Sequence, residues 1–435
     1  MQFVNRADAC HECPLGSDGT DAVWEWGETE LNGDGVFGQS TALGRGVFRP
    51  DRQYCRLHRP STPVESRLEN IELLKKLCET PGVPGREERV RALIQKEVKG
   101  LFDSVEVDPM GSLICRRGPR AGRKKGAGSQ GKGEKSRKAV GGRPKRVMLL
   151  SHMDEIGFYV TYVDKNGFLW MNPAGGFDTR NLFSRRVLVC TDGGDYQGVM
   201  NPGGRPLHIS GPKDREKIPE VKEFYVDLGR SGEKVKGLVK VGDYVVMHEP
   251  AIEVGDKVVS KALDNRVACW LGIESVRRLD AQGLGHSCEI IVAFTTQEEV
   301  GLRGAKTASF AVLPDIGLGL DVTLACDTPG IPDEEAVTRH GLGFGLHIKD
   351  SSFIADHTLV AEFEALAKKH KIPFQRTILA AGGQDGAAAQ QSAAGARAVG
   401  ITVGTRYIHT VTEMVDKKDL FAARDILAVY LASVR

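Results

Sequence analysis

Histidine and carboxylate side chains recur in five short segments that each follow a predicted strand or open a predicted helix. The segments are HMDE at 152–155, ALDN at 262–265, QEE at 297–299, LD at 320–321 and YIH at 407–409. They hold two histidines, several carboxylates and no thiolate, a donor set that suits a borderline divalent metal ion in a catalytic site. Open α/β sheets bind ligands beyond the carboxyl ends of their strands, so these groups can converge there.

The number of candidate ligands favours two metal ions over one. The candidates are His152, Asp264, Glu299, Asp321 and His409. Five ligands exceed what one open tetrahedral site takes. Two cations that share a bridging carboxylate would use all five. We therefore expect two divalent cations in each chain, and the sequence does not rank zinc, cobalt and manganese.

Two further carboxylates are expected to assist the metal ligands. Glu298 and Glu299 can both face the site only beyond the end of their strand, because consecutive strand residues point to opposite faces. The glycines that follow them allow such a change of direction. Glu298 then remains free to act as a general base. Asp154 lies two residues after His152, where its carboxylate can accept the other imidazole N–H.

Each of these residues also has an ordinary structural interpretation. Asp264 could cap the helix that follows it, a single histidine after a buried strand is usually structural, and neighbouring glutamates are usually solvated. The combination of five such segments favours a site. Two carboxylates alone would also suit a metal-independent glycosidase that uses Glu298, and sensitivity to a chelator distinguishes the two readings.

The periodicity of apolar residues predicts the elements that must position these groups. Helical spacing appears at 68–77 and 90–98, and further helices are expected at 265–279 and 359–370. Short apolar runs predict strands near 105–115, 147–150, 289–294 and 316–320. Helices and strands that alternate in this way predict an α/β sheet with helices on its faces. Frequent turn residues over 161–256 predict a small all-β module inserted into that domain.

Composition indicates a globular protein. The chain has 435 residues, 41% of them hydrophobic and 27% charged, which is enough for about two to three domains. Its apolar runs are far shorter than the roughly 20 residues that cross a bilayer, so no membrane span is expected. The first residues lack an apolar signal core, and we expect a cytoplasmic protein. The nine scattered cysteines suit reduced thiols.

One segment concentrates the positive charge of the chain. Residues 116–146 contain thirteen Lys or Arg and one acid, an excess of +12, so the net charge of +2 leaves the remainder at −10. Such a composition cannot bury a core and predicts a mobile insertion loop. Nucleic-acid binding is the alternative interpretation, but the segment has no interleaved aromatic residues for base stacking. We expect a solvated loop and no nucleic-acid partner.

Residues 1–65 read as an extension appended to the main domain. They are rich in turn formers and show no sustained helical or strand period. Cys10 and Cys13, with Cys55 and His58, form two pairs at finger-like spacing. Three cysteines and one histidine can close a tetrahedral structural zinc site, so an additional zinc is a candidate for this extension.

Five segments also match, in order, the motifs of a known peptidase family. They are HMDEIG at 152–157, KALDNR at 261–266, QEEVGLRGA at 297–305, DVT at 321–323 with DTPG at 327–330, and RYIH at 406–409. The chain resembles the glutamyl and deblocking aminopeptidases, dinuclear metallopeptidases whose members often build tetrahedral dodecamers. The resemblance runs from about Leu68 to the end of the chain, apart from the basic insertion.

The resemblance implies a fold and an activity. The fold would be a zinc-peptidase-like α/β/α sandwich with a small β-barrel-like domain inserted. Residues 66–160 and 257–435 would form the catalytic domain, and 161–256 the inserted dimerisation domain. The activity would be removal of N-terminal residues from short peptides by a homo-oligomer, in the family a dodecamer. A related dinuclear amidase, deacylase or carboxypeptidase is the alternative within the same chemistry.

The resemblance also implies how the ligands divide. One cation would be held by His152, Asp264 and Asp321, and the other by Asp264, Glu299 and His409, with Asp264 as the bridge. It gives the role of general base to the glutamate that precedes Glu299.

Three residues depart from the family pattern. Asn265 stands where a second aspartate is usual, Gln384 replaces a threonine, and Gly404 replaces a common proline. None of them is a proposed ligand. They bear on the shape of the substrate pocket more than on the chemistry.

Overall fold

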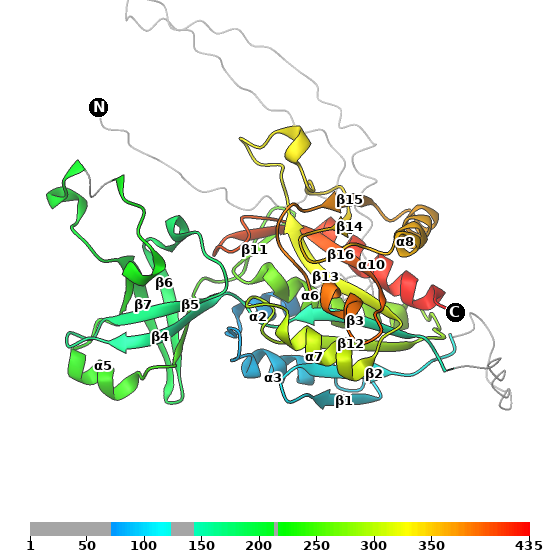
Figure 1. Cartoon of the computed structure of the whole chain (residues 1–435), viewed down its shortest axis with the longest axis horizontal. Helices are drawn as coiled ribbons and strands as arrows, with labels where there is room; N and C mark the ends of the chain where they lie inside the picture. The colour runs from blue at the N-terminus through cyan, green and yellow to red at the C-terminus, as the bar shows by residue number, and fades with distance from the viewer. Residues whose placement is uncertain (1–70, 123–142, 213–215) are drawn as a thin grey trace, which may run out of the picture. The chain divides into compact units, whose positions relative to one another are not determined.

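The computed structural model describes residues 71–122, 143–212 and 216–435 (Figure 1). The extension 1–65, with Cys10, Cys13, Cys55 and His58, lies outside the described residues. Within the described ranges, no helix combines the length and the apolar character needed to span a bilayer.

A mixed eleven-stranded sheet forms the centre of the main domain. Its four middle strands are parallel and lie side by side in the order β12, β3, β13, β16. They span Glu289–Thr295, Arg146–His152, Ile316–Leu324 and Arg397–Arg406, respectively. The carboxyl ends of these strands meet at one edge of the sheet, which is where parallel sheets place their ligands.

The remaining strands extend this sheet on both sides. Strands β2 and β1 continue it beyond β12, and β17, β11 and β10 continue it beyond β16, while β14 and β15 branch from β16. Their bounds are Ser104–Val107 for β1, Leu113–Arg117 for β2, Ile252–Val254 for β10, Lys257–Ser260 for β11, Phe344–Lys349 for β14, Phe374–Ile378 for β15 and Glu413–Asp416 for β17. Strand β17 thus connects the middle of the sheet to β11, which leads into helix α6.

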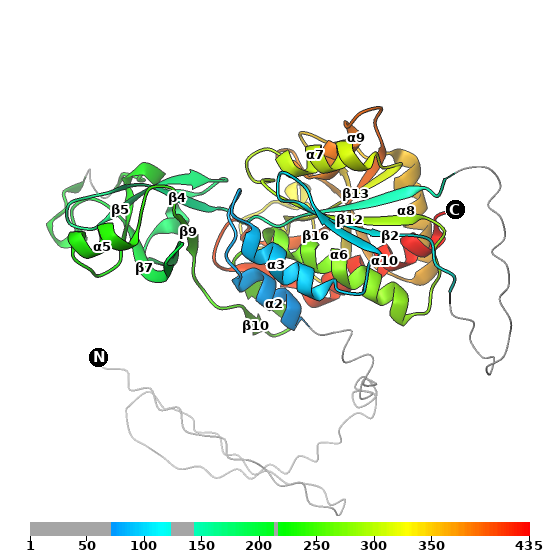
Figure 2. The same ribbon diagram turned by 90° about the horizontal axis from the view of Figure 1, so that it is seen from below.

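Helices cover both faces of the sheet, and Figure 2 shows the resulting three layers. Helices α2, α3, α6, α8 and α10 lie on one face, and α7 and α9 lie on the other. Their bounds are Glu72–Glu79, Glu88–Glu97, Leu263–Ala281, His357–His370, Lys417–Ser433, Arg303–Val312 and Gly386–Gln390, in that order. The predicted α/β/α sandwich is confirmed.

Strand β3 illustrates why the layers form. Val147 and Leu149 pack into the core on the α6 face, whereas Met148 and Leu150 pack against α7 and α9. All four are fully buried. A continuous apolar run that alternates between two covered faces is typical of a parallel strand in an α/β protein. The predicted strand at 147–150 therefore lies at the centre of the sheet and ends at His152.

The inserted β module is a closed six-stranded barrel, as the resemblance implied. Its strands are β4 Gly157–Val163, β5 Leu169–Ala174, β6 Arg185–Thr191, β7 Gly194–Pro202, β8 Phe224–Asp227 and β9 Tyr244–Met247, with helix α5 at Gly232–Leu238. The predicted bounds of this module, 161–256, are therefore shifted. The barrel strands begin at Gly157 and end at Met247, and the later strands β10 and β11 pair with the main sheet. A Cβ on Gly157 would lie 2.3 Å from Val83 Cγ1, so the first barrel strand begins in close contact with the α/β domain.

The range predicted for the mobile loop, 116–146, extends too far at both ends. Arg116 and Arg117 belong to β2, and Arg146 opens β3. Arg117 is buried and forms an ion pair with Asp280. Composition registers the positive charge of these residues but not their acidic partners, which are Asp280 of α6 and Glu289 of β12. Residues 123–142 lie outside the described residues.

Candidate metal centre

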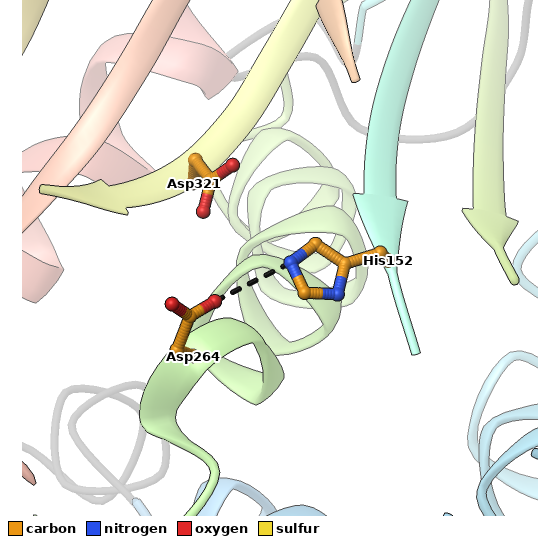
Figure 3. A group of neighbouring side chains, drawn as sticks. All are labelled: His152, Asp264 and Asp321. Atoms are coloured by element: carbon orange, nitrogen blue, oxygen red, sulfur yellow. Dashed lines mark ion pairs between the residues drawn. The ribbon is translucent and has the colours of Figure 1, made fainter. Parts of the chain in front are cut away.

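Three elements bring the first group of candidate ligands together. His152 is the last residue of β3, Asp321 lies in the neighbouring strand β13, and Asp264 lies at the start of α6. Figure 3 shows the three side chains directed toward one another from these elements. Ligand atoms of the three residues all lie within 4.8 Å of one another. His152 is 1% exposed and Asp321 7%, so the group is shielded from solvent.

Asp264 faces both histidines at once. Its Oδ1 lies 3.3 Å from His152 Nε2, and its Oδ2 lies 3.4 Å from His409 Nε2. Glu299 Oε2 is 3.5 Å from the same His409 nitrogen. Asp264, Glu299 and His409 thus form a second group whose ligand atoms lie within 4.8 Å. The two groups share only Asp264, which has the position of a bridging carboxylate.

Glu298 lies beside the first group. Its Oε2 is 3.8 Å from His152 Nε2, and it forms a third close group with His152 and Glu299. All six residues that the sequence singled out as ligands or base are therefore brought into one cluster. Its members are His152, Asp264, Glu298, Glu299, Asp321 and His409.

The turn after β12 directs Glu298 and Glu299 to the same side. Strand β12 ends at Thr295, and Gln297 adopts a left-handed conformation with φ of 56°. The backbone N–H groups of Glu298 and Glu299 donate to the two carboxylate oxygens of Asp154, at 3.1 and 3.0 Å. The change of direction predicted beyond the strand end is present, and Asp154 holds it.

Asp154 also lies behind His152. Its backbone carbonyl oxygen is 3.2 Å from His152 Nδ1, and its Oδ1 is 3.4 Å from the same nitrogen. A partner on Nδ1 leaves Nε2 as the nitrogen that faces Asp264. The sequence predicted the contact with the imidazole but missed the two bonds to the turn, because those depend on a segment about 140 residues later.

Two buried glutamates that sequence reasoning missed hold the backbone around the cluster. Glu87 Oε1 accepts the N–H of Gln297 at 3.0 Å. Glu413 accepts the N–H of Asp264 at 2.9 Å and that of His409 at 2.8 Å. Glu87 precedes α3 and Glu413 opens β17, where a single sequence gives no signal that a carboxylate is buried.

The charge of the cluster fits divalent cations. Four carboxylates meet two imidazoles, and among the described residues no Lys or Arg forms an ion pair with any of these carboxylates. Glu299 Oε1 is buried and has no hydrogen-bond partner. Uncompensated buried charge is costly unless it is paired or coordinates metal. These residues therefore fit a pair of metal ions.

Burial and mutual repulsion shift the protonation of the cluster. Burial raises the pKa values of Glu298 and Asp321 well above their usual range, with further contributions from neighbouring carboxylates. Burial alone would lower the pKa of His409, but its contacts with Asp264 and Glu299 raise it to about 11. Without cations the cluster therefore retains protons that metal ions would displace.

A carboxylate–histidine cluster at the carboxyl edge of a parallel sheet is typical of metal-dependent hydrolases with an α/β fold. The chain belongs to the M42 glutamyl aminopeptidase family, whose model matches residues 136–426. It is therefore a hydrolase of peptide bonds, and its relatives support an aminopeptidase activity.

Relatives and solved structures agree with this assignment. The chain is 34% identical to a putative aminopeptidase of Acetivibrio thermocellus, over 82% of this chain and 97% of the relative. It is 33% identical to a TET aminopeptidase of a thaumarchaeote from marine sediment, with a TM-score of 0.75. This match covers 84% of the present chain and 96% of the TET aminopeptidase chain. It is 28% identical, with a TM-score of 0.69, to the TET1 peptidase of Pyrococcus horikoshii, which can assemble into a tetrahedron or an octahedral shell; the match covers 83% and 98%.

Proposed function

We propose that the chain is a metal-dependent aminopeptidase that removes N-terminal residues from short peptides. One cation would be held by His152, Asp264 and Asp321, and the other by Asp264, Glu299 and His409. The observation that carries this proposal is the placement of Asp264, whose two oxygens face different histidines at 3.3 and 3.4 Å. When bound at such a site, a pair of divalent cations polarises a carbonyl group and lowers the pKa of water.

Glu298 would move the proton. Its side chain is 12% exposed and lies beside His152, and desolvation raises its pKa well above the usual range. A base with a raised pKa can take a proton from the attacking water and then return it to the nitrogen of the departing amine. The C–N bond breaks as that nitrogen is protonated. Asp154 would keep Glu298 in place through the bond to its backbone N–H.

Family membership supports this activity over the alternatives that the sequence left open. A related dinuclear amidase or carboxypeptidase would not require a free amino terminus next to the cleaved bond, and a deacylase would prefer substrates whose amino terminus is blocked. A glycosidase would need no metal. The nucleic-acid interpretation rested on residues 116–146, and five of the basic residues at the described ends of that segment form ion pairs within the fold: Arg116, Arg117, Arg120, Arg143 and Arg146.

Metal removal with a substrate panel tests the proposed function. Protein stripped with a chelator should lose hydrolysis of aminoacyl anilides and recover it on addition of Zn²⁺, Co²⁺ or Mn²⁺. Anilides with an acetylated amino group serve as the matched control and should remain uncleaved. Full activity after complete metal removal would contradict the metal-dependent mechanism, and preference for the acetylated substrates would indicate a deacylase. The same panel identifies the preferred N-terminal residue.

We further propose that the chain forms a homo-oligomer through the barrel, whose strands lie within 157–247. The assembly described for the Pyrococcus horikoshii relative supports this proposal. A dodecamer would have twelve times the 47.2 kDa mass of one chain. Light scattering coupled to gel filtration measures the mass of the particle in solution. A mass equal to that of one chain at all concentrations would contradict the proposed homo-oligomer.

A further inference from the structure

Glu413 is a buried carboxylate that the hydrolytic mechanism does not use. It opens strand β17, where it lies opposite Ser260 of strand β11. Glu413 is only 2% exposed to solvent. A carboxylate in such a position is costly unless hydrogen-bond donors satisfy its oxygens. Both oxygens of Glu413 are satisfied by backbone N–H groups of the metal centre.

The two donors belong to candidate ligands that lie far apart in the chain. Glu413 Oε2 accepts the N–H of Asp264 at 2.9 Å, and Oε1 accepts the N–H of His409 at 2.8 Å. Each carboxylate oxygen of Glu413 thus accepts a hydrogen bond from a different candidate metal ligand. The rigid, planar carboxylate therefore connects the backbones of Asp264 and His409.

Regular secondary structure does not fix either donor residue. Asp264 has φ of −80° and ψ of 101°, which are not helical values although the residue lies at the start of α6. His409 adopts a left-handed conformation with φ of 64° in the loop between β16 and β17. A non-glycine residue holds a left-handed conformation such as that of His409 only where its surroundings enforce it. The Glu413 carboxylate is the group that contacts both backbones.

We propose that Glu413 is a positioning residue, which fixes the separation of Asp264 and His409 and thereby the affinity for the cation that these two residues share. Their ligand atoms, Oδ2 and Nε2, lie 3.4 Å apart. Loss of a group that orients metal ligands typically weakens metal binding about 10- to 100-fold. The inference rests on the proposed function, because it concerns the cations assigned there.

Two variants of Glu413 separate geometry from the chemical nature of the group. Glu413→Gln replaces one acceptor oxygen with an NH₂ donor, so one of the two backbone N–H groups loses its partner. Glu413→Asp keeps the carboxyl group but is shorter by one methylene and cannot reach both donors. If position is what matters, both variants should bind one of the two cations about 10- to 100-fold more weakly.

Asp419→Asn is a matched control. Asp419 is also fully buried and also accepts two backbone N–H bonds, from Gly341 at 2.8 Å and from Gly343 at 2.7 Å. Neither glycine is a candidate ligand. Asp419→Asn should therefore lower the midpoint of thermal unfolding while it leaves the affinities for both cations unchanged.

The measurement is a titration of metal-free protein with Co²⁺, followed by visible absorbance and checked by metal content after gel filtration. The double variant Glu413→Gln with His409→Ala should lose less affinity than the sum of the two single losses, because both changes act on the same cation. Wild-type affinities in both Glu413 variants, or equal weakening in Asp419→Asn, would overturn the inference. Failure of both Glu413 variants to fold, while Asp419→Asn folds, would also overturn it. If the wild-type protein binds no cation, the proposed function fails instead.

Discussion

Single hydrogen bonds at the site decide which atoms remain available for chemistry. Asp321 Oδ1 accepts the Val322 N–H at 2.7 Å and the Asn265 Nδ2 amide at 2.9 Å. These two donors occupy one oxygen and leave the other free to bind a cation. Asn265 is oriented in turn because its Oδ1 accepts the Ala268 N–H at 3.0 Å. The asparagine that departs from the family pattern therefore has a defined role as a donor to Asp321.

Removal of the carboxylate of Glu298 should separate catalysis from metal binding. Glu298→Gln is expected to keep the metal content of the wild-type protein, because each cation retains its three proposed ligands. Its kcat should fall by about 10²- to 10⁴-fold, the usual contribution of a general acid–base group. Metal analysis and steady-state kinetics measure the two quantities. The exposed Glu106 offers a control, since Glu106→Gln should change neither. Wild-type turnover in Glu298→Gln would remove this residue from the mechanism.

At the scale of elements, the site depends on how closely α7 approaches the end of β12. Gly304 lies in the first turn of α7. A Cβ at this position would lie 2.6 Å from both the backbone N and O of Thr296. Thr296 precedes the turn that carries Glu298 and Glu299. The glycine therefore permits the contact that keeps this turn against the sheet.

Gly304→Ala should destabilise the fold and impair the site together. Overpacking of this kind typically costs about 1 to 3 kcal/mol, and a shift of Thr296 would displace the Glu298 carboxylate and lower kcat/KM. Gly237→Ala is the matched control, because Gly237 lies in helix α5 with no atom within 4 Å of an added Cβ. It should be neutral or stabilising by up to about 1 kcal/mol. Urea denaturation and kinetics test both variants, and equal effects would contradict the packing argument.

At the scale of the whole molecule, the buried charge of the site couples stability to pH and to metal. The pKa of His409 rises from 6.5 to about 11 in the fold, so its stabilising contribution is complete below 6.5 and is lost as pH rises toward 11. The raised pKa values of Glu298 and Asp321 act in the same direction, because the fold binds their protons more tightly than the unfolded chain does. The metal-free protein should therefore lose stability as pH rises.

Divalent cations should oppose this loss. The increase in the midpoint of thermal unfolding on addition of saturating Zn²⁺ is expected to be larger at about pH 8 than at about pH 5, because the cations compete with protons for the same ligands. Burial lowers the pKa values of His286 and His340, which act with the opposite sign. Neither is a candidate ligand, so their effects cancel in the difference between metal-free and loaded protein. A metal-induced increase that shrinks as pH rises would contradict this coupling.

The sequence by itself determined the elements and the candidate ligands. The strand at 147–150, the helix at 265–279 and the residues from His152 to His409 followed from apolar periodicity and side-chain chemistry, which are local properties of the chain. The motifs also indicated the family to which the chain belongs.

Only the tertiary structure decided how these residues support one another. Asp264 faces two histidines, Glu413 accepts the backbone N–H of Asp264, and the buried Arg117 pairs with Asp280. Each of these contacts joins segments that are distant in sequence. Periodicity shows which face of an element is buried but not which distant backbone or charge will meet it. Those contacts form only when the helices pack against the sheet.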